Sequence, residues 1–115
     1  MGFLTKQQIL DARDLEKEVI SVPEWDGEIV LCTLTGRQRD KIETEVVNAK
    51  NNKIDNFRVK LLSMSIVDGE GHRLFSDEDI EALGSKNSKV LHRIFERALE
   101  LNGIGQEAVK DLTKN

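Results

Sequence analysis

The apolar residues of this chain follow two periods, and the first is that of a β-strand. In residues 16–22 two apolar side chains, Ile20 and Val22, fall on one face of an extended segment, and residues 28–34 carry an apolar run on both faces. Turn-forming residues separate the two runs. The pattern predicts an antiparallel β-hairpin at about residues 16–34.

The turn of this hairpin holds the only proline and the only tryptophan of the chain. A large aromatic ring beside a rigid proline can bury much apolar area at a small cost in side-chain entropy. We therefore expect Trp25 to anchor the end of the hairpin against a helix. The residues to which the sequence assigns structural roles are Pro23, Trp25, Gly27 and Gly36.

A helical period dominates the remainder of the chain. Thr5 with Gln8, and Thr35 with Gln38, have the spacing of capping boxes that begin helices. The predicted helices cover residues 5–14, 36–49, 54–67 and 76–84, followed by a longest helix that carries a core stripe from Val90 to Leu99 and ends at Asn102. The third of these is apolar nearly all round and is predicted to be the central buried helix.

These elements predict an α+β fold that is mainly helical, with the N-terminal antiparallel hairpin and four or five helices. We expect one domain over residues 1–115, with the hairpin at about 16–34 and the helical part at about 35–113. A chain of 115 residues is long enough to bury a core without disulfides. Its single cysteine, Cys32, lies in a predicted strand and is interpreted as a small buried apolar residue.

Charge and composition narrow the kinds of partner. A net charge of -4 and only five aromatic residues argue against binding to nucleic acid, which needs a basic face and stacking surfaces. The sequence lacks a run of about 18 apolar residues, so we expect no membrane-spanning segment and a location in the cytoplasm. A polypeptide partner fits this composition best.

Four basic residues form the strongest local charge pattern. They recur at helical spacing and are Lys86, Lys89, Arg93 and Arg97. Glu96 and Glu100 lie among them, so we interpret the pattern as a solvated face of mixed charge and not as a docking strip.

The polar residues predict no catalytic or metal site. The carboxylates are numerous, but none is paired in sequence with a partner that would mark acid-base chemistry. Counted from Asp68, a calcium-binding loop needs an oxygen ligand and then glycine where this chain has His72 and Arg73. We expect no enzymatic activity, no metal, no cofactor and no small-molecule substrate.

An ordered series of short motifs extends over nearly the whole chain. After an N-terminal helix rich in Leu and Ile come Val22-Pro23-Glu24-Trp25-Asp26-Gly27, Leu34-Thr35-Gly36 with Arg39-Asp40, Val67-Asp68-Gly69-Glu70-Gly71 with Arg73-Leu74-Phe75, Asp79-Ile80 with Leu83-Gly84, and Ala98-Leu99 with Leu101-Asn102-Gly103. In this order the chain resembles small tail assembly chaperones of long-tailed bacteriophages and prophages.

The resemblance implies a non-catalytic protein that binds the aggregation-prone tape-measure protein while the tail tube is built around it. It further implies action in the cytoplasm of the bacterial host and absence from the mature virion. The tail tube protein is a further partner of such systems, and self-association stays open. The alternatives are a structural virion component, such as a tail terminator or head-tail connector protein, and a small prophage-encoded adaptor.

A chaperone of this kind needs apolar contact residues that its own core does not use. The segments least needed for the core are the two ends of the chain. The predicted partner-binding residues are Phe3, Leu4, Ile9, Leu10, Ile104, Val109 and Leu112.

Overall fold

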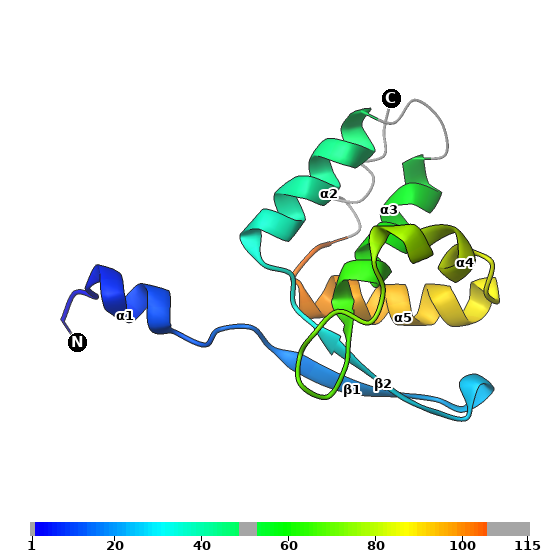
Figure 1. The fold of residues 1–115 in the computed structure, drawn as a ribbon, viewed down its shortest axis with the longest axis horizontal. Coiled ribbons are helices and arrows are strands. Elements are labelled where there is room, and N and C mark those ends of the chain that lie inside the picture. The colour runs from blue at the N-terminus through cyan, green and yellow to red at the C-terminus, as the bar shows by residue number, and fades with distance from the viewer. Residues whose placement is uncertain (1, 49–52, 106–115) are drawn as a thin grey trace.

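The computed structural model describes residues 2–48 and 53–105 and confirms the α+β fold (Figure 1). The helices are α1 (Lys6–Asp11), α2 (Gly36–Asn48), α3 (Lys53–Ser65), α4 (Ile80–Gly84) and α5 (Ser88–Leu101). The strands are β1 (Lys17–Val22), β2 (Gly27–Cys32) and β3 (Ile66–Val67), and short 3-10 helices η1 (Pro23–Trp25) and η2 (Asp77–Asp79) complete the order.

The predicted hairpin is confirmed as the pair β1 and β2, which run antiparallel from Lys17 opposite Cys32 to Val22 opposite Gly27. The third strand was not predicted. Helix α3 ends at Ser65, and the next two residues leave the helix to pair with β2. The predicted helix over 54–67 is therefore wrong at its end. Both residues are β-branched and suit a strand once a partner strand is present.

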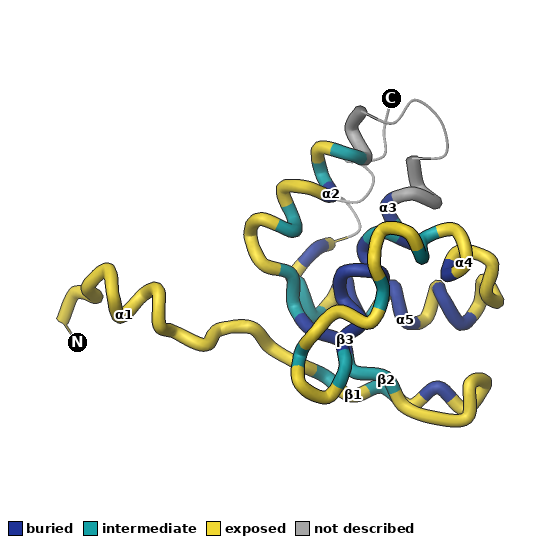
Figure 2. Tube along the Cα trace, viewed as in Figure 1, coloured by how far each residue is buried: buried dark blue, intermediate teal, exposed yellow. Residues whose placement is uncertain are grey.

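The core lies where α3 meets α5 and the sheet. Residues 61–67 are all buried, which confirms that the apolar third helix is central (Figure 2). Helix α2 packs on α3, and α5 contacts α3 and both strands of the hairpin. The rings of Phe57 and Phe95 meet edge to face, with centroids 5.8 Å apart. The predicted stripe of α5 is buried throughout: Val90, Leu91, Ile94, Phe95, Ala98 and Leu99.

Ile104 belongs to this core, so the prediction that it lies in a segment outside the core is wrong. Its side chain is only 9% exposed. Gly103 adopts a left-handed backbone with φ of 68°, and the amide of Ile104 donates to the carbonyl of Leu99 at 2.9 Å. This is the pattern of a Schellman C-cap, which usually brings the residue after the glycine back onto the helix.

The turn of the hairpin has its left-handed residue at Asp26, with φ of 57°. Pro23 occupies the start of η1, where its missing amide hydrogen costs nothing. A Cβ atom added at Gly27 or Gly36 would meet nothing closer than 4.0 Å, so neither position requires glycine for steric reasons.

Two arginines of α5 form ion pairs with the hairpin, one at its turn and one near the start of β1. Arg93 donates from Nη1 and Nη2 to the two carboxylate oxygens of Glu24, at 2.7 and 2.8 Å. Arg97 donates to Glu18 at 2.6 Å and also pairs with Glu100. Half of the basic series is thus neutralised within the protein, in agreement with a face of mixed charge.

The pairing of Glu24 with Arg93 should make stability depend on pH. The hydrogen bonds from Arg93 lower the pKa of Glu24 from 4.5 to about 2. A carboxylate with a lowered pKa stabilises the folded state above its unfolded pKa, and this contribution is lost as the pH falls through the folded pKa. The melting temperature of wild type should therefore exceed that of Glu24→Gln near pH 7, and this difference should disappear between about pH 4.5 and about pH 2.

Thermal melts of both proteins over this pH range measure the effect. Glu28→Gln is the matched control, because Glu28 is exposed and forms no ion pair with any described residue. A difference for Glu24→Gln that stays constant down to about pH 2 would refute the assignment.

Substitution of Ile104 should destabilise the fold although it lies near the end of the described chain. Ile104→Ala should lower the free energy of unfolding by about 2 kcal/mol, because a buried aliphatic side chain is removed. Ile9→Ala, on an exposed helix, should change it by less than about 0.5 kcal/mol. Urea denaturation compares the two, and equal values would contradict the placement of Ile104 in the core.

Candidate functional site

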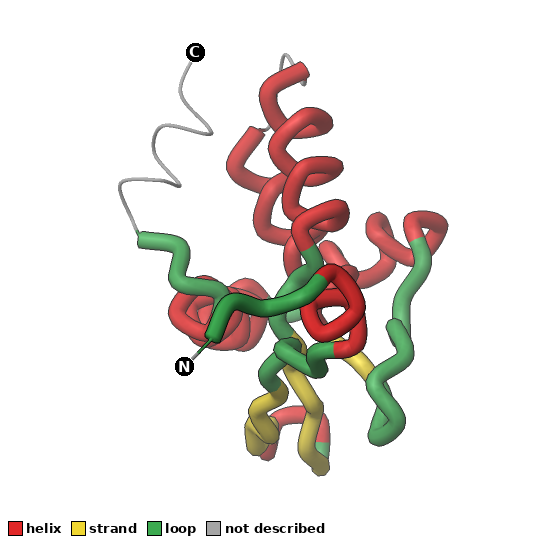
Figure 3. The backbone as a smooth tube through the Cα atoms, turned by 90° about the vertical axis from the view of Figure 1, so that its left-hand side faces the viewer, coloured by secondary structure: helices red, strands yellow, loops and turns green. Residues whose placement is uncertain are grey.

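Helix α1 lies apart from the rest of the described chain, beyond the start of β1 (Figure 1), and in Figure 3 it lies in front of the other elements. None of its residues is buried. It begins with the predicted capping box, in which Gln8 N donates to Thr5 Oγ1 at 3.2 Å and Thr5 N donates to Gln8 Oε1 at 2.9 Å. The predicted N-terminal helix is confirmed, and it ends at Asp11 instead of at about Asp14. We call residues 2–15 the N-terminal arm.

Most of the large exposed apolar side chains of the described chain lie on the arm. The predicted contact residues Phe3, Leu4, Ile9 and Leu10 all lie on it, with exposed fractions between 56% and 105%. Such a concentration of apolar surface usually marks an interaction site. A helix of six residues is also short for one that is stable by itself in water. The structure therefore brings these four residues together on one accessible segment.

The other predicted contact residues are not on this surface. Ile104 is part of the core, as described above. Val109 and Leu112 lie outside the described residues.

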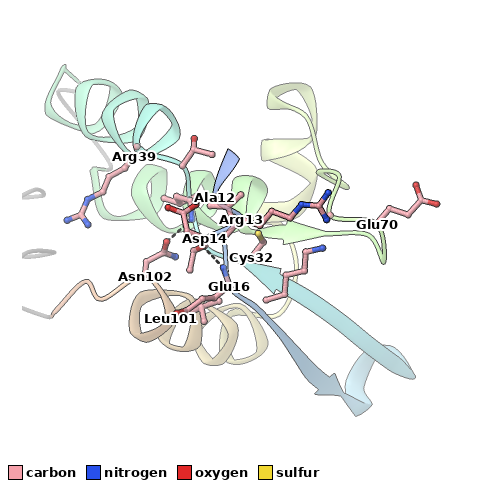
Figure 4. A pocket seen from close by; sticks show the side chains of 16 residues that line it. Ala12, Arg13, Asp14, Glu16, Cys32, Arg39, Glu70, Leu101 and Asn102 are labelled. Atoms are coloured by element: carbon pink, nitrogen blue, oxygen red, sulfur yellow. Dashed lines mark hydrogen bonds between the residues drawn. The ribbon is translucent and has the colours of Figure 1, made fainter. Parts of the chain in front are cut away.

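An open cleft with a volume of about 880 Å³ lies where the arm joins the folded part of the chain (Figure 4). Its lining carries charges of both signs, including Arg13, Asp14 and Glu16, and the charged ends of Arg39 and Glu70 extend away from the other labelled side chains. The lining combines these charges with apolar residues, among them Leu15, Leu34 and Leu101.

Hydrogen bonds in this cleft join Glu16, the residue after the arm, to Thr33 at the end of β2. Glu16 N donates to Thr33 Oγ1 at 3.0 Å, and Thr33 N donates to the carbonyl of Glu16 at 2.9 Å. Nearby, Leu34 N donates to Asn102 Oδ1 at 2.7 Å, which ties the end of β2 to the end of α5. The arm therefore leaves from a fixed point of the sheet.

A second apolar surface lies at the opposite end of the hairpin. We call it the Trp25 groove; it has a volume of about 260 Å³ and is lined by Trp25, Phe75, Asp79, Ala82, Leu83 and Lys86. Trp25 lines this groove together with residues of η2 and α4, but it is 36% exposed and is not part of the core, so the prediction that it is buried against a helix is wrong. No local sequence pattern marks the groove, because Trp25 lies at least fifty positions before the other lining residues in the chain.

In the acidic turn after β3, the carboxylate of Asp68 forms hydrogen bonds within the turn itself. The carboxylate of Asp68 accepts from the amides of Glu70 and His72, at 2.8 and 3.0 Å. These hydrogen bonds, above all that from His72, lower the pKa of Asp68. Across residues 2–48 and 53–105, no three metal-binding side chains gather into a possible site, and no helix is long and apolar enough to cross a membrane.

Comparisons with known proteins agree with this architecture. The family model for phage tail assembly chaperones matches residues 5–115. The structure of the tail assembly chaperone of bacteriophage HK97 superposes with a TM-score of 0.62 and 24% sequence identity, over 83% of this chain and 94% of that one, which shows a shared fold. No curated protein sequence matches significantly. Because the family model covers nearly the whole chain, this protein belongs to the phage tail assembly chaperones.

Proposed function

We propose that this protein acts without catalysis and binds the tape-measure protein during tail assembly, through its N-terminal arm. The observation that supports this most is the arm itself, a capped helix with no buried residue and four large exposed apolar side chains. Membership of the chaperone family favours this role over a tail terminator, a head-tail connector or a prophage-encoded adaptor.

The arm suits a partner with long helical and partly apolar segments. Helix-helix recognition of this kind uses a few apolar anchors with polar residues around them. The arm provides both, since Lys6, Gln7 and Asp11 share the short helix with Ile9 and Leu10. It can bind without disturbing the core, because the core does not use it.

The same proposal places the protein in the cytoplasm of the host while the tail is built, and not in the mature virion. The tail tube protein and a second copy of the chain are further partners in this proposal. Mass spectrometry of purified particles tests the location: peptides of this protein at the abundance of a tail component would support a structural role instead.

The role of the arm is tested by co-expression with the tape-measure protein. Leu4→Asp with Leu10→Asp removes two apolar anchors from a segment that contributes nothing to the core. Two lost anchors should weaken binding by about tenfold or more, because a few buried apolar residues carry most of the energy of such contacts. The measurement is the amount of soluble tape-measure protein that co-purifies.

The matched control is Gly2→Asp with Ala12→Asp, which adds the same charge to exposed positions of the arm. Thermal melts should show that both double variants remain folded. If the folded Leu4 and Leu10 variant retains its partner as well as wild type does, the arm is not the site. Failure of wild type itself to solubilise or co-purify with the tape-measure protein would overturn the proposed function. Val109→Asp with Leu112→Asp tests the C-terminal residues in the same way.

A further inference from the structure

We infer that Thr33 and Asn102 are positioning residues for the N-terminal arm, so that binding through the arm depends on two side chains that do not lie on it. This inference rests on the proposed function, in which the arm binds the tape-measure protein. Thr33 follows the end of β2 and Asn102 follows the end of α5, so both belong to the folded part of the chain.

The arm has no anchor of its own in the core. None of the residues of α1 is buried, and no residue from 2 to 15 belongs to the hydrophobic core. The hydrogen bonds of Thr5, Gln7 and Gln8 stay within the arm. Among the described residues, Glu16 is the first that forms a hydrogen bond with a distant part of the chain. The freedom of the arm is therefore decided at Glu16.

Thr33 holds Glu16 with both its main chain and its side chain. Its amide donates to the carbonyl of Glu16 at 2.9 Å, as in a regular antiparallel pair. In such a pair the amide of Glu16 donates to the opposite carbonyl, but here it donates to the hydroxyl of Thr33 at 3.0 Å. The hydroxyl thus completes the pair although the chain leaves β2 here, two residues before the capping box of α2 begins at Thr35.

Loss of the hydroxyl would lengthen the free connection to the arm. The pair of Glu16 with Thr33 is the last of the hairpin, and the end of a hairpin frays when its hydrogen bonds are removed. Hydrogen-bonded pairs alternate along an antiparallel ladder, so the next one is Glu18 with Leu31. The connection after α1 would then grow from residues 12–15 to residues 12–17. A freer arm loses more conformational freedom on binding and binds less tightly.

Asn102 fixes the chain segment that carries Thr33 to helix α5. Its Oδ1 accepts from the amide of Leu34 at 2.7 Å, and its Nδ2 donates to the carbonyl of Ala98 at 2.8 Å. The side chain is half-buried and lines the same cleft as residues 12–15 of the arm (Figure 4). One side chain therefore joins the residue after Thr33 to the last turn of α5.

Matched substitutions separate positioning from stability. Thr33→Val removes the hydroxyl and keeps the branched shape of the side chain, whereas Thr33→Ser keeps the hydroxyl. Asn102→Ala removes both side-chain hydrogen bonds, whereas Asn102→Asp keeps an acceptor for the amide of Leu34. Ile94→Val lowers stability in the core, away from these contacts. Thermal melts establish that each variant is folded.

Nuclear magnetic resonance measures the freedom of the arm in the full chain. The order parameters of the α1 amides should fall in Thr33→Val and in Asn102→Ala, and they should stay at the wild-type values in the other three variants. The amide hydrogen of Glu16 should exchange faster in Thr33→Val. Binding to the tape-measure protein should weaken by about fivefold in Thr33→Val and Asn102→Ala, because a freer arm must be ordered, and should stay near wild type in the others.

The inference is overturned if the α1 order parameters of Thr33→Val equal those of wild type, because Thr33 then does not hold the arm. It is also overturned if Thr33→Ser or Ile94→Val weakens binding as much as Thr33→Val does, since the loss then follows stability and not the hydroxyl.

Failure of the inference is distinguishable from failure of the proposed function. If Leu4→Asp with Leu10→Asp abolishes binding but Thr33→Val binds like wild type, the arm is the site and does not need positioning, so the inference alone fails. If wild type does not bind the tape-measure protein, or the Leu4 and Leu10 variant binds as well as wild type, the proposed role of the arm fails together with the inference.

Discussion

The structure depends on the burial of residues 61–67, a run that begins in α3 and ends in β3. Every residue of this run is buried, so its backbone groups need partners within the protein. Helix α3 supplies them up to Ser65, and pairing with β2 supplies them for Ile66 and Val67. The same segment joins the helical layer to the sheet, because α2, α4 and α5 all pack on α3.

Sequence reasoning succeeded where the signal is local. The hairpin follows from strand periodicity around a proline turn, and the helix starts follow from Thr5 with Gln8 and Thr35 with Gln38, whose reciprocal hydrogen bonds the structure contains. The exposed residues of the arm were also found locally, because a short helix before the first strand has little to pack against.

The features that sequence reasoning missed depend on contacts between distant segments. The apolar pair Ile66 and Val67 fits a buried helix as well as a strand, and only the presence of β2 decides between them. Ile104 was assigned to the surface because it follows the end of the last long helix. The asparagine and glycine before it were a usable signal, since a glycine after a helix often begins a Schellman motif that returns the next residue to the core. The groove had no such signal, because Trp25 and Ala82 meet only in the folded chain.

The two apolar surfaces are related through strand β1. The arm precedes the first residue of β1, and the tip that carries Trp25 follows its last, so the six residues of the strand place the end of the arm and the tip roughly 20 Å apart. Hydrogen bonds fix the arm at Glu16, and Arg93 and Arg97 hold the strand against α5. Two apolar surfaces joined by one rigid strand would act together on a partner long enough to reach both, because binding at one raises the effective concentration at the other.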